Sequence, residues 1–255
     1  MTTDPLQPDQ SDPLQAWYRS ALGAEVALIE GDCAQRLLAN TFGYYLVQIG
    51  ASEGFGAALA ASRIRHRIRL SGARSADVVQ GSTVVSDPTA LPLASDSIDA
   101  ILLPHVLEYS DQPRAILSEV ERVLIPEGRL ILLGFNPLSL WGLGCLWPSA
   151  RRRAPWNGHW RLAAQVERWL TELGFEIESR ERALFCPLFV SPNGRRCLAA
   201  ESLGRRFWPL FGGLYVIRAV KRVAPLTPIK PYRARRCTLL PGGAVRPTTR
   251  GTGHV

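Results

Sequence analysis

Short apolar runs alternate with amphipathic stretches over most of the chain. Apolar residues that recur every three or four positions, or an alanine-rich composition, predict helices at residues 14–28, 34–41, 54–63, 111–124 and 160–173. Compact apolar runs predict strands at residues 45–49, 66–70, 83–86, 97–103, 129–135, 174–182 and 214–220. Strands that alternate with helices favour an α/β fold with a mostly parallel sheet covered on both faces. The last two strands lack a good crossover helix, so we expect them to form an antiparallel edge pair.

The first predicted strand runs directly into a glycine-containing stretch, IGASEGFGAALA, at residues 49–60. In parallel sheets, ligands bind at the carboxyl ends of the strands, near the point where strand order reverses. Two interpretations fit this stretch: a weakened nucleotide-binding loop, or an ordinary turn from a strand into a helix. Both need glycine at the turn, so the spacing alone does not separate them.

Length and charge divide the chain into three regions. Its 255 residues suit one medium α/β domain, which we place at residues 14–224. Residues 1–13 are polar and proline-rich, as in a flexible lead-in, and do not resemble a signal peptide. Residues 202–255 hold 11 of the 30 basic residues and no acidic residue, and residues 225–255 are expected to form a disordered basic tail. Such a tail can contact nucleic acid or anionic lipid. A solvated tail without a specific partner is the favoured interpretation, so no specific nucleic acid is predicted.

The five cysteines form no CxxC pair and no metal-ligand spacing with a histidine. Scattered cysteines in odd number are typical of reduced thiols in a cytoplasmic protein. The sequence therefore predicts no metal site, and it leaves the oligomeric state open.

An uncharged stretch covers residues 130–150 and ends in Arg151, Arg152 and Arg153. Pro137 would break a membrane-spanning helix, so we expect a buried strand followed by an apolar loop or short helix. The favoured use of this loop is a lid over an active site. Peripheral contact with a membrane surface, through the segment from Trp141 to Trp156, is the alternative.

A series of ordered motifs lies between residues 86 and 132. They are Asp87 with Leu-Pro-Leu at 91–93, Asp-Ser-Ile-Asp at 96–99, His-Val-Leu-Glu-Tyr at 105–109, Arg-Val-Leu at 122–124 and Pro-Glu-Gly at 126–128. This order resembles the type 11 family of class I S-adenosylmethionine (SAM)-dependent methyltransferases, over roughly residues 44–135. The resemblance implies a Rossmann-like fold with a mostly parallel seven-stranded sheet, an antiparallel edge pair, helices on both faces, and SAM as the cofactor.

The resemblance also implies where SAM would bind. The implied cofactor-binding residues are Gln48, Gly50, Ala51, Ser52, Gly54, Asp87, Pro88 and Pro104. Three features depart from the family pattern: Ser52 replaces the middle glycine, Gln48 replaces the usual acid, and the strand at 66–70 is not followed by the acid that binds the ribose. The nearest acid is Asp77. For Asp87, a role in opening the turn before Pro88 is an equal alternative to binding adenine.

His105 lies just past the fourth predicted strand, where the methyl group of SAM should face. It is the candidate general base, and the alternative is a structural histidine at the corner. Asn136-Pro137 follows the fifth strand and lacks a second proline, so it does not match the motif of adenine and glutamine methyltransferases. The leading hypothesis is a methyltransferase for a small-molecule acceptor. A methyltransferase-like binding protein without turnover is the alternative, and an RNA methyltransferase ranks last.

Overall fold

A computed structural model describes residues 13–51, 53–71, 83–146, 149–185, 204, 206 and 208–223. Residues 1–12 of the lead-in expected at 1–13 lie outside the described residues, as does the basic tail at 225–255, whereas Pro13 begins a helix. Ser52 and Asp77 also lie outside the described residues.

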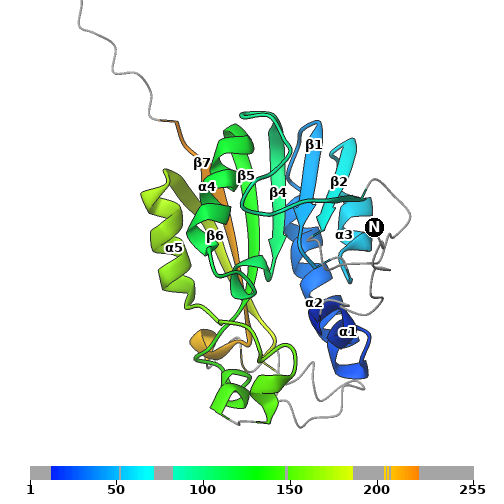
Figure 1. Ribbon diagram of the computed structural model, residues 1–255, viewed down its shortest axis with the longest axis vertical. Helices are drawn as coiled ribbons and strands as arrows, with labels where there is room; N and C mark the ends of the chain where they lie inside the picture. Colours follow the sequence, from blue (N-terminus) through cyan, green and yellow to red (C-terminus); the bar gives the residue numbers. More distant parts are fainter. Residues whose placement is uncertain are drawn as a thin grey trace, which may run out of the picture. The chain divides into compact units, whose positions relative to one another are not determined.

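The centre of the fold is a seven-stranded sheet with the order β3-β2-β1-β4-β5-β7-β6 (Figure 1). Its strands are β1 Tyr45–Ile49, β2 His66–Ser71, β3 Thr83–Val85, β4 Ile98–Pro104, β5 Leu124–Phe135, β6 Phe175–Ala183 and β7 Leu214–Lys221. β1 to β5 pair in parallel, whereas β7 runs antiparallel to both β5 and β6. The strand order reverses between β1 and β4, which makes their carboxyl ends the expected ligand site. The predicted Rossmann-like sheet with an antiparallel pair at its edge is confirmed.

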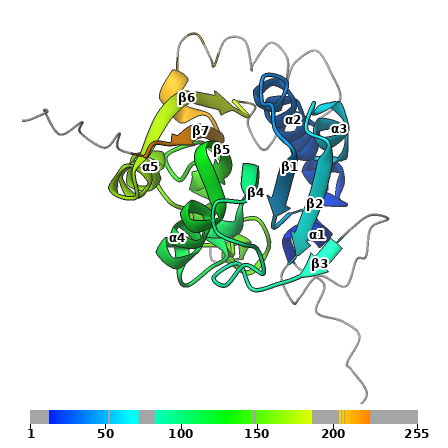
Figure 2. The same ribbon diagram turned by 90° about the horizontal axis from the view of Figure 1, so that it is seen from above.

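Helices cover both faces of the sheet (Figure 2). They are α1 Pro13–Tyr18, α2 Ala21–Leu38, α3 Gly56–Ala61, α4 Pro113–Val123 and α5 Ala163–Glu172. Two apolar cores result, because alternate residues of each buried strand point to opposite faces. Leu46 and Leu102 pack with α1, α2 and α3, whereas Val47 and Ile101 pack with α4 and α5.

The N-terminal helices differ from the sequence expectation of helices at 14–28 and 34–41. The break falls at Ser20, whose Oγ accepts a hydrogen bond from the Gly23 backbone N–H at 3.1 Å. A serine that satisfies this amide begins a new helix, so α2 runs unbroken through the expected gap. The apolar spacing was interpreted correctly as helical, but the capping signal was missed.

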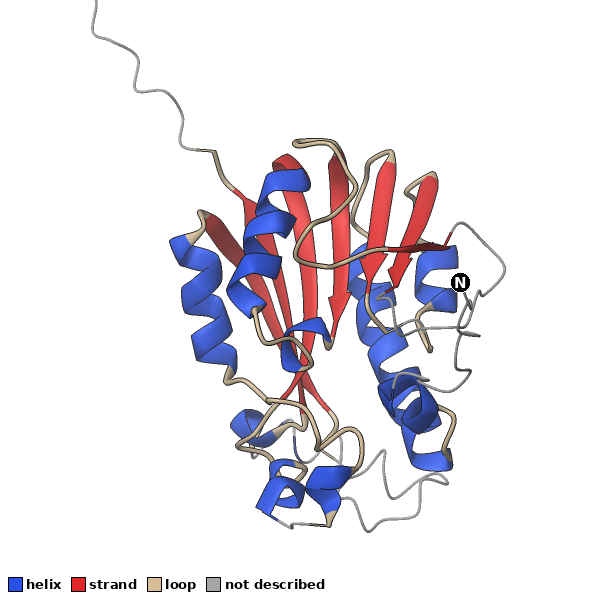
Figure 3. Ribbon diagram, viewed as in Figure 1, coloured by secondary structure: helices blue, strands red, loops and turns tan. Residues whose placement is uncertain are grey.

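Between β5 and α5 the chain forms two short 3₁₀ helices, η2 Gly142–Leu146 and η3 Ala150–Arg152. Asn136, the first residue after β5, anchors this segment. Its Nδ2 donates to the Leu210 and Gly212 carbonyls at 3.0 Å each, near the 3₁₀ helix η4 Pro209–Phe211. Figure 3 shows these short helices gathered beyond the carboxyl ends of the parallel strands. In the described part of the chain, no helix combines the length and apolar character that crossing a bilayer requires.

Candidate functional site

A cavity of about 790 Å³ opens at the carboxyl ends of β1 and β4. That volume lies within the range of small-molecule and cofactor pockets. Its lining includes six residues that the sequence assigned to the site, namely Gly50, Ala51, Asp87, Pro88, Pro104 and His105. Leu14 of α1 lies at its margin. The structure therefore brings together residues that follow β1, β3 and β4, from Gly50 to His105 along the chain.

Gly50 shapes the floor of this cavity. Its backbone N–H donates to the Leu70 carbonyl at 3.1 Å, which continues the pairing of β1 with β2 by one residue. Its φ of +98° is a conformation that side chains disfavour. A Cβ there would lie 2.3 Å from Val106 Cγ2 and 3.0 Å from the Pro104 carbonyl oxygen. Glycine is required because the loop passes close to Pro104, the last residue of β4, and to Val106.

Gln48, in β1, and Gly54, in the loop that follows, do not line the cavity. Gln48 is buried, and its Nε2 donates back to the Ala51 carbonyl. A Cβ at Gly54 would meet Ala27 of α2 at 2.6 Å, so this glycine allows the loop to pack on that helix. Their expected contact with SAM stays a prediction, and the structure gives each a role in the shape of the loop.

Asp87 opens a turn and also lines the cavity, while its expected binding of adenine stays a prediction. It lines the cavity, and its Oδ1 also accepts hydrogen bonds from the Thr89 N–H at 2.8 Å and the Thr89 hydroxyl at 2.7 Å. These two bonds, the backbone one foremost, hold the pKa of the Asp87 carboxyl below its usual range. The side chain is therefore ionised and fixed by the turn while it faces the cavity.

His105 is enclosed in a buried ionic cluster. Its Nδ1 lies 2.8 Å from Glu108 Oε2, and its Nε2 lies 2.9 Å from Glu30 Oε1. The Tyr18 hydroxyl donates to the other oxygen of Glu30 at 2.7 Å. Glu108 also accepts from the Phe135 backbone N–H. Both imidazole nitrogens are thus engaged, so in this arrangement neither is free to accept a proton from a substrate.

The cluster keeps His105 charged. Burial alone lowers the pKa of the imidazole, but Glu30 and Glu108 outweigh it and raise that pKa to about 10. The left-handed backbone at His105, with φ of 56°, is unusual for a residue with a side chain. Since the two carboxylates come from α2 and from the turn after β4, this cation fixes α2 against the cavity wall. The geometry favours the structural alternative for His105, and the general-base role stays a prediction.

The cavity is also lined by residues that the sequence analysis did not single out as candidates. The segment Asn157, Gly158 and His159 lines it, and the His159 backbone N–H donates to the Glu108 carbonyl at 2.7 Å. Tyr109, the last residue of the motif at 105–109, lines it as well and donates its hydroxyl to the Pro155 carbonyl at 3.1 Å. The only sequence signal was a short polar run between Trp156 and Trp160. The ring of His159 makes no hydrogen bond recorded among the described residues, and it is exposed.

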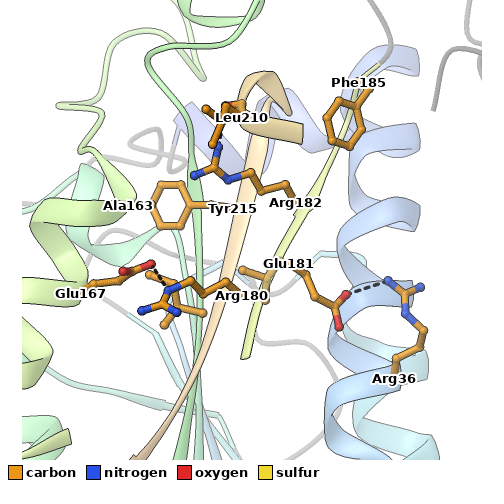
Figure 4. Close-up of a pocket in the computed structure, with 11 residues that line it drawn as sticks. Arg36, Ala163, Glu167, Arg180, Glu181, Arg182, Phe185, Leu210 and Tyr215 are labelled. Atoms are coloured by element: carbon orange, nitrogen blue, oxygen red, sulfur yellow. Dashed lines mark hydrogen bonds and ion pairs between the residues drawn. The ribbon is translucent and has the colours of Figure 1, made fainter. Parts of the chain in front are cut away.

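A second cavity, of about 480 Å³, lies along the outer strand β6 (Figure 4). Its three arginines are already engaged. Arg180 pairs with Glu167 at 2.8 Å, Arg36 pairs with Glu181 at 3.1 Å, and Arg182 donates to the Leu210 carbonyl at 2.6 Å. These bonds tie β6 to its neighbours, so this cavity is a weaker candidate for ligand binding than the one at the strand ends.

A family model described as a methyltransferase domain matches residues 34–132. The chain is 34% identical over 187 residues to the uncharacterized protein YafS of Escherichia coli (strain K12), an alignment that covers 73% of this chain and 72% of that protein. The chain belongs to the type 11 family of class I SAM-dependent methyltransferases. Two solved structures share its fold. One is a chain from the complex of the Haloferax volcanii Trm112 methyltransferase activator with a methyltransferase (18% identity, TM-score 0.59, 85% of this chain and 99% of that chain). The other is a SAM-dependent methyltransferase from Thermotoga maritima (19% identity, TM-score 0.58, 81% and 94%).

The cofactor of this methyltransferase family is SAM, and the site offers chemistry that fits it. Gln48 Oε1 is buried in β1 without a hydrogen-bond partner among the described atoms, and it is an acceptor of the kind that the ammonium of SAM needs, although Gln48 does not line the cavity. The Asp87 carboxylate is an acceptor suited to the adenine amine. The described part of β2 ends at Ser71 without an acid for the ribose hydroxyls, as the sequence predicted.

Proposed function

We propose that this methyltransferase-family protein binds SAM in the cavity at the ends of β1 and β4 and transfers its methyl group to a small molecule. One observation carries the proposal. The glycine loop, Asp87 and Pro104 line one cavity together with Tyr109 and His159. A single cavity that joins a cofactor-binding loop to further polar side chains can hold SAM and an acceptor together, and in-line methyl transfer requires that both are positioned.

This chain's residues would act mainly by positioning. Gln48, the Gly50 loop and Asp87 would hold SAM, which supplies the electrophilic methyl group. An acceptor nucleophile that must lose a proton could give it to His159, which also lines the cavity, because both nitrogens of His105 are already bonded. His159 thereby replaces His105 as the proposed proton acceptor.

Calorimetric titration with SAM tests the cofactor half of the proposal. Asp87→Asn removes the charge that faces the cavity, so the Kd should rise about tenfold, as expected for the loss of one charge-assisted hydrogen bond. Asp32→Asn is the matched control, because Asp32 is an exposed acid of α2 that does not line the cavity. Equal Kd values for the two variants would contradict this placement of SAM.

Transfer of label from methyl-tritiated SAM tests the acceptor half. The protein would be incubated with cell extract, which is then separated into small-molecule, RNA and protein fractions. Label in the small-molecule fraction supports the proposal, and His159→Ala should reduce it about a hundredfold without changing the SAM Kd. Label mainly in RNA would contradict the small-molecule acceptor, and SAM binding without transfer to any fraction would favour the binding-protein alternative.

A further inference from the structure

The segment between β5 and α5 presents leucines to solvent in an unusual pattern. From Asn136 to Leu146, the residues that are exposed are Leu138, Leu140, Leu143 and Leu146. Ser139 and Trp141, which alternate with them, are buried. The polar Ser139 is thus buried while the leucines are exposed, which is the reverse of an ordinary surface loop. Several exposed apolar residues gathered in one segment mark an interaction site more often than chance exposure.

The leucines point outward because the space beneath them is filled. Trp141 is buried, and its ring stacks on Trp156 with centroids 6.3 Å apart. The Trp156 indole N–H donates to the Trp141 carbonyl at 2.9 Å. A Cβ at Gly144 would lie 2.3 Å from Trp156 Nε1, so the backbone of η2 rests directly on this indole. The aromatic pair supports η2 from below and leaves no room for the leucines to turn inward.

A second exposed apolar segment lies beside the first. Trp208, Leu210 and Phe211 are exposed around η4, and the Leu210 carbonyl accepts a hydrogen bond from Asn136 at 3.0 Å. The apolar surface therefore extends from η2 to η4.

Positive charge borders this surface. Arg151, Arg152 and Arg153 are exposed, and residues 136–160 contain no acidic side chain. Among the described residues, none of these three arginines forms an ion pair, although the Arg151 Nε donates a hydrogen bond to the Cys145 carbonyl. Leucines flanked by arginines without an acidic partner are complementary to an anionic bilayer, which offers apolar chains for the leucines and phosphates for the arginines.

We propose that η2, η3 and η4 form a docking surface for an anionic phospholipid bilayer, with the leucines entering the headgroup boundary and Arg151–Arg153 contacting phosphates. The same segment continues to Asn157 and His159, which line the cavity. Docking would therefore place the cavity beside the bilayer. If the proposed methyl transfer holds, the acceptor class would then be a lipophilic small molecule taken from the membrane.

Cosedimentation of the full-length protein with vesicles tests the proposal. The vesicles would be phosphatidylcholine alone, or phosphatidylcholine with roughly one-third phosphatidylglycerol. The unmodified protein should bind the anionic vesicles about tenfold more tightly or better. Leu146→Ser and Leu28→Ser form a matched pair, since the two leucines are 70% and 71% exposed and Leu28 lies on α2. Leu146→Ser should weaken vesicle binding severalfold, and the change of all four leucines to serine should weaken it at least about tenfold. Leu28→Ser should bind like the unmodified protein.

A second pair tests the charge. Arg152→Gln with Arg153→Gln should weaken binding to anionic vesicles severalfold, whereas Arg63→Gln with Arg65→Gln, just before the amino end of β2, should not. The basic residues at 224–255 are present in every variant, so binding through them alone would leave all variants equal and overturn the proposal. If the serine variants instead convert a dimer to a monomer without lipid and leave vesicle binding unchanged, the surface joins two copies of the chain and the proposal also fails. SAM titration of the same variants reports separately on the proposed methyltransferase function.

Discussion

At the scale of single residues, the corner after β4 is held by charge rather than prepared to move a proton. The carboxylates of Glu30 and Glu108 each contact one ring nitrogen of His105, and Phe135 stacks on its ring with centroids 4.1 Å apart. A buried cation of this kind is stable only while both carboxylates remain. This geometry favours a positioning role for His105, which the following variant tests, and its expected role as general base stays a prediction.

His105→Gln should remove a specific dependence of stability on pH. The folded pKa of His105, about 10, lies above its ordinary value of 6.5. Its contribution is therefore complete below pH 6.5 and is lost as the pH rises through about 10. Urea unfolding between these pH values should show the free energy of unfolding falling by a few kcal/mol in the unmodified protein. The variant should lack this decline.

The groups that face the imidazole are Glu30, Glu108 and, through Glu30, Tyr18. Burial, more than Glu30, raises the pKa of Tyr18 well above 10, so this tyrosine does not titrate in the same interval. His66→Gln is the control, because His66 is exposed at the start of β2. A decline of equal size in the His105 variant would show that another group produces it.

Gly50→Ala should cost stability because of the protein itself rather than a ligand. The new Cβ would overlap Val106, and the φ of +98° adds strain, so we expect a loss of about 1–3 kcal/mol in the free energy of unfolding. Val106→Ala removes the overlapping methyl group, so the double variant should lose less than the sum of the two single losses. In Gly56→Ala, the Cβ would meet only an arginine nitrogen at 3.8 Å, and stability should be kept or raised. Strict additivity in urea unfolding would refute the contact with Val106.

At the scale of elements, one hydrogen bond decides where α2 begins. Ser20→Ala removes the acceptor for the Gly23 N–H and should lower the free energy of unfolding by about 0.5–2 kcal/mol. Ser149→Ala is a matched control, because Ser149 occupies the same position before η3 but makes no capping hydrogen bond. In thermal unfolding, Ser20→Ala should therefore lower the Tm, whereas Ser149→Ala should leave it unchanged. Similar losses would mean that the serine at this break acts through something other than its hydroxyl.

Periodicity predicted a strand such as β4 well because it is a compact apolar run. By contrast, β5 begins at Leu124, five residues before the predicted start, and this part was missed because residues 125–128 carry no such run. The sequence also placed Gly50, Asp87 and His105 at strand ends, where a parallel sheet collects them. It did not predict Glu30, because its partner His105 lies 75 positions away and no motif links them. His159 was missed for a similar reason: a loop residue reaches the cavity only through contacts such as the one with Glu108. Local patterns indicate elements, whereas these pairings depend on the assembled fold.

At the scale of the whole molecule, two cavities compete for the ligand, and hydrogen exchange can distinguish them. At a SAM concentration of about 100 times its Kd, binding should stabilise the fold by about 2.7 kcal/mol. Added protection should concentrate at Gly50, Ala51 and the turn after Pro104, which line the larger cavity. Protection confined to Arg180 and Arg182 would instead assign SAM to the cavity beside β6.

The position of β7 has a consequence for the synthesis of this protein. It is the last strand in the described chain, yet it pairs with β5 on one side and β6 on the other. A nascent chain that ends before Leu214 therefore carries two strands whose backbone amides and carbonyls have no partner on the facing sides. Such open edges favour pairing with other chains, and long-range pairing forms slowly. The ribosome must release nearly the whole domain before the sheet can close, so the chain is most exposed to aggregation, and most dependent on chaperones, in the interval between β6 and β7.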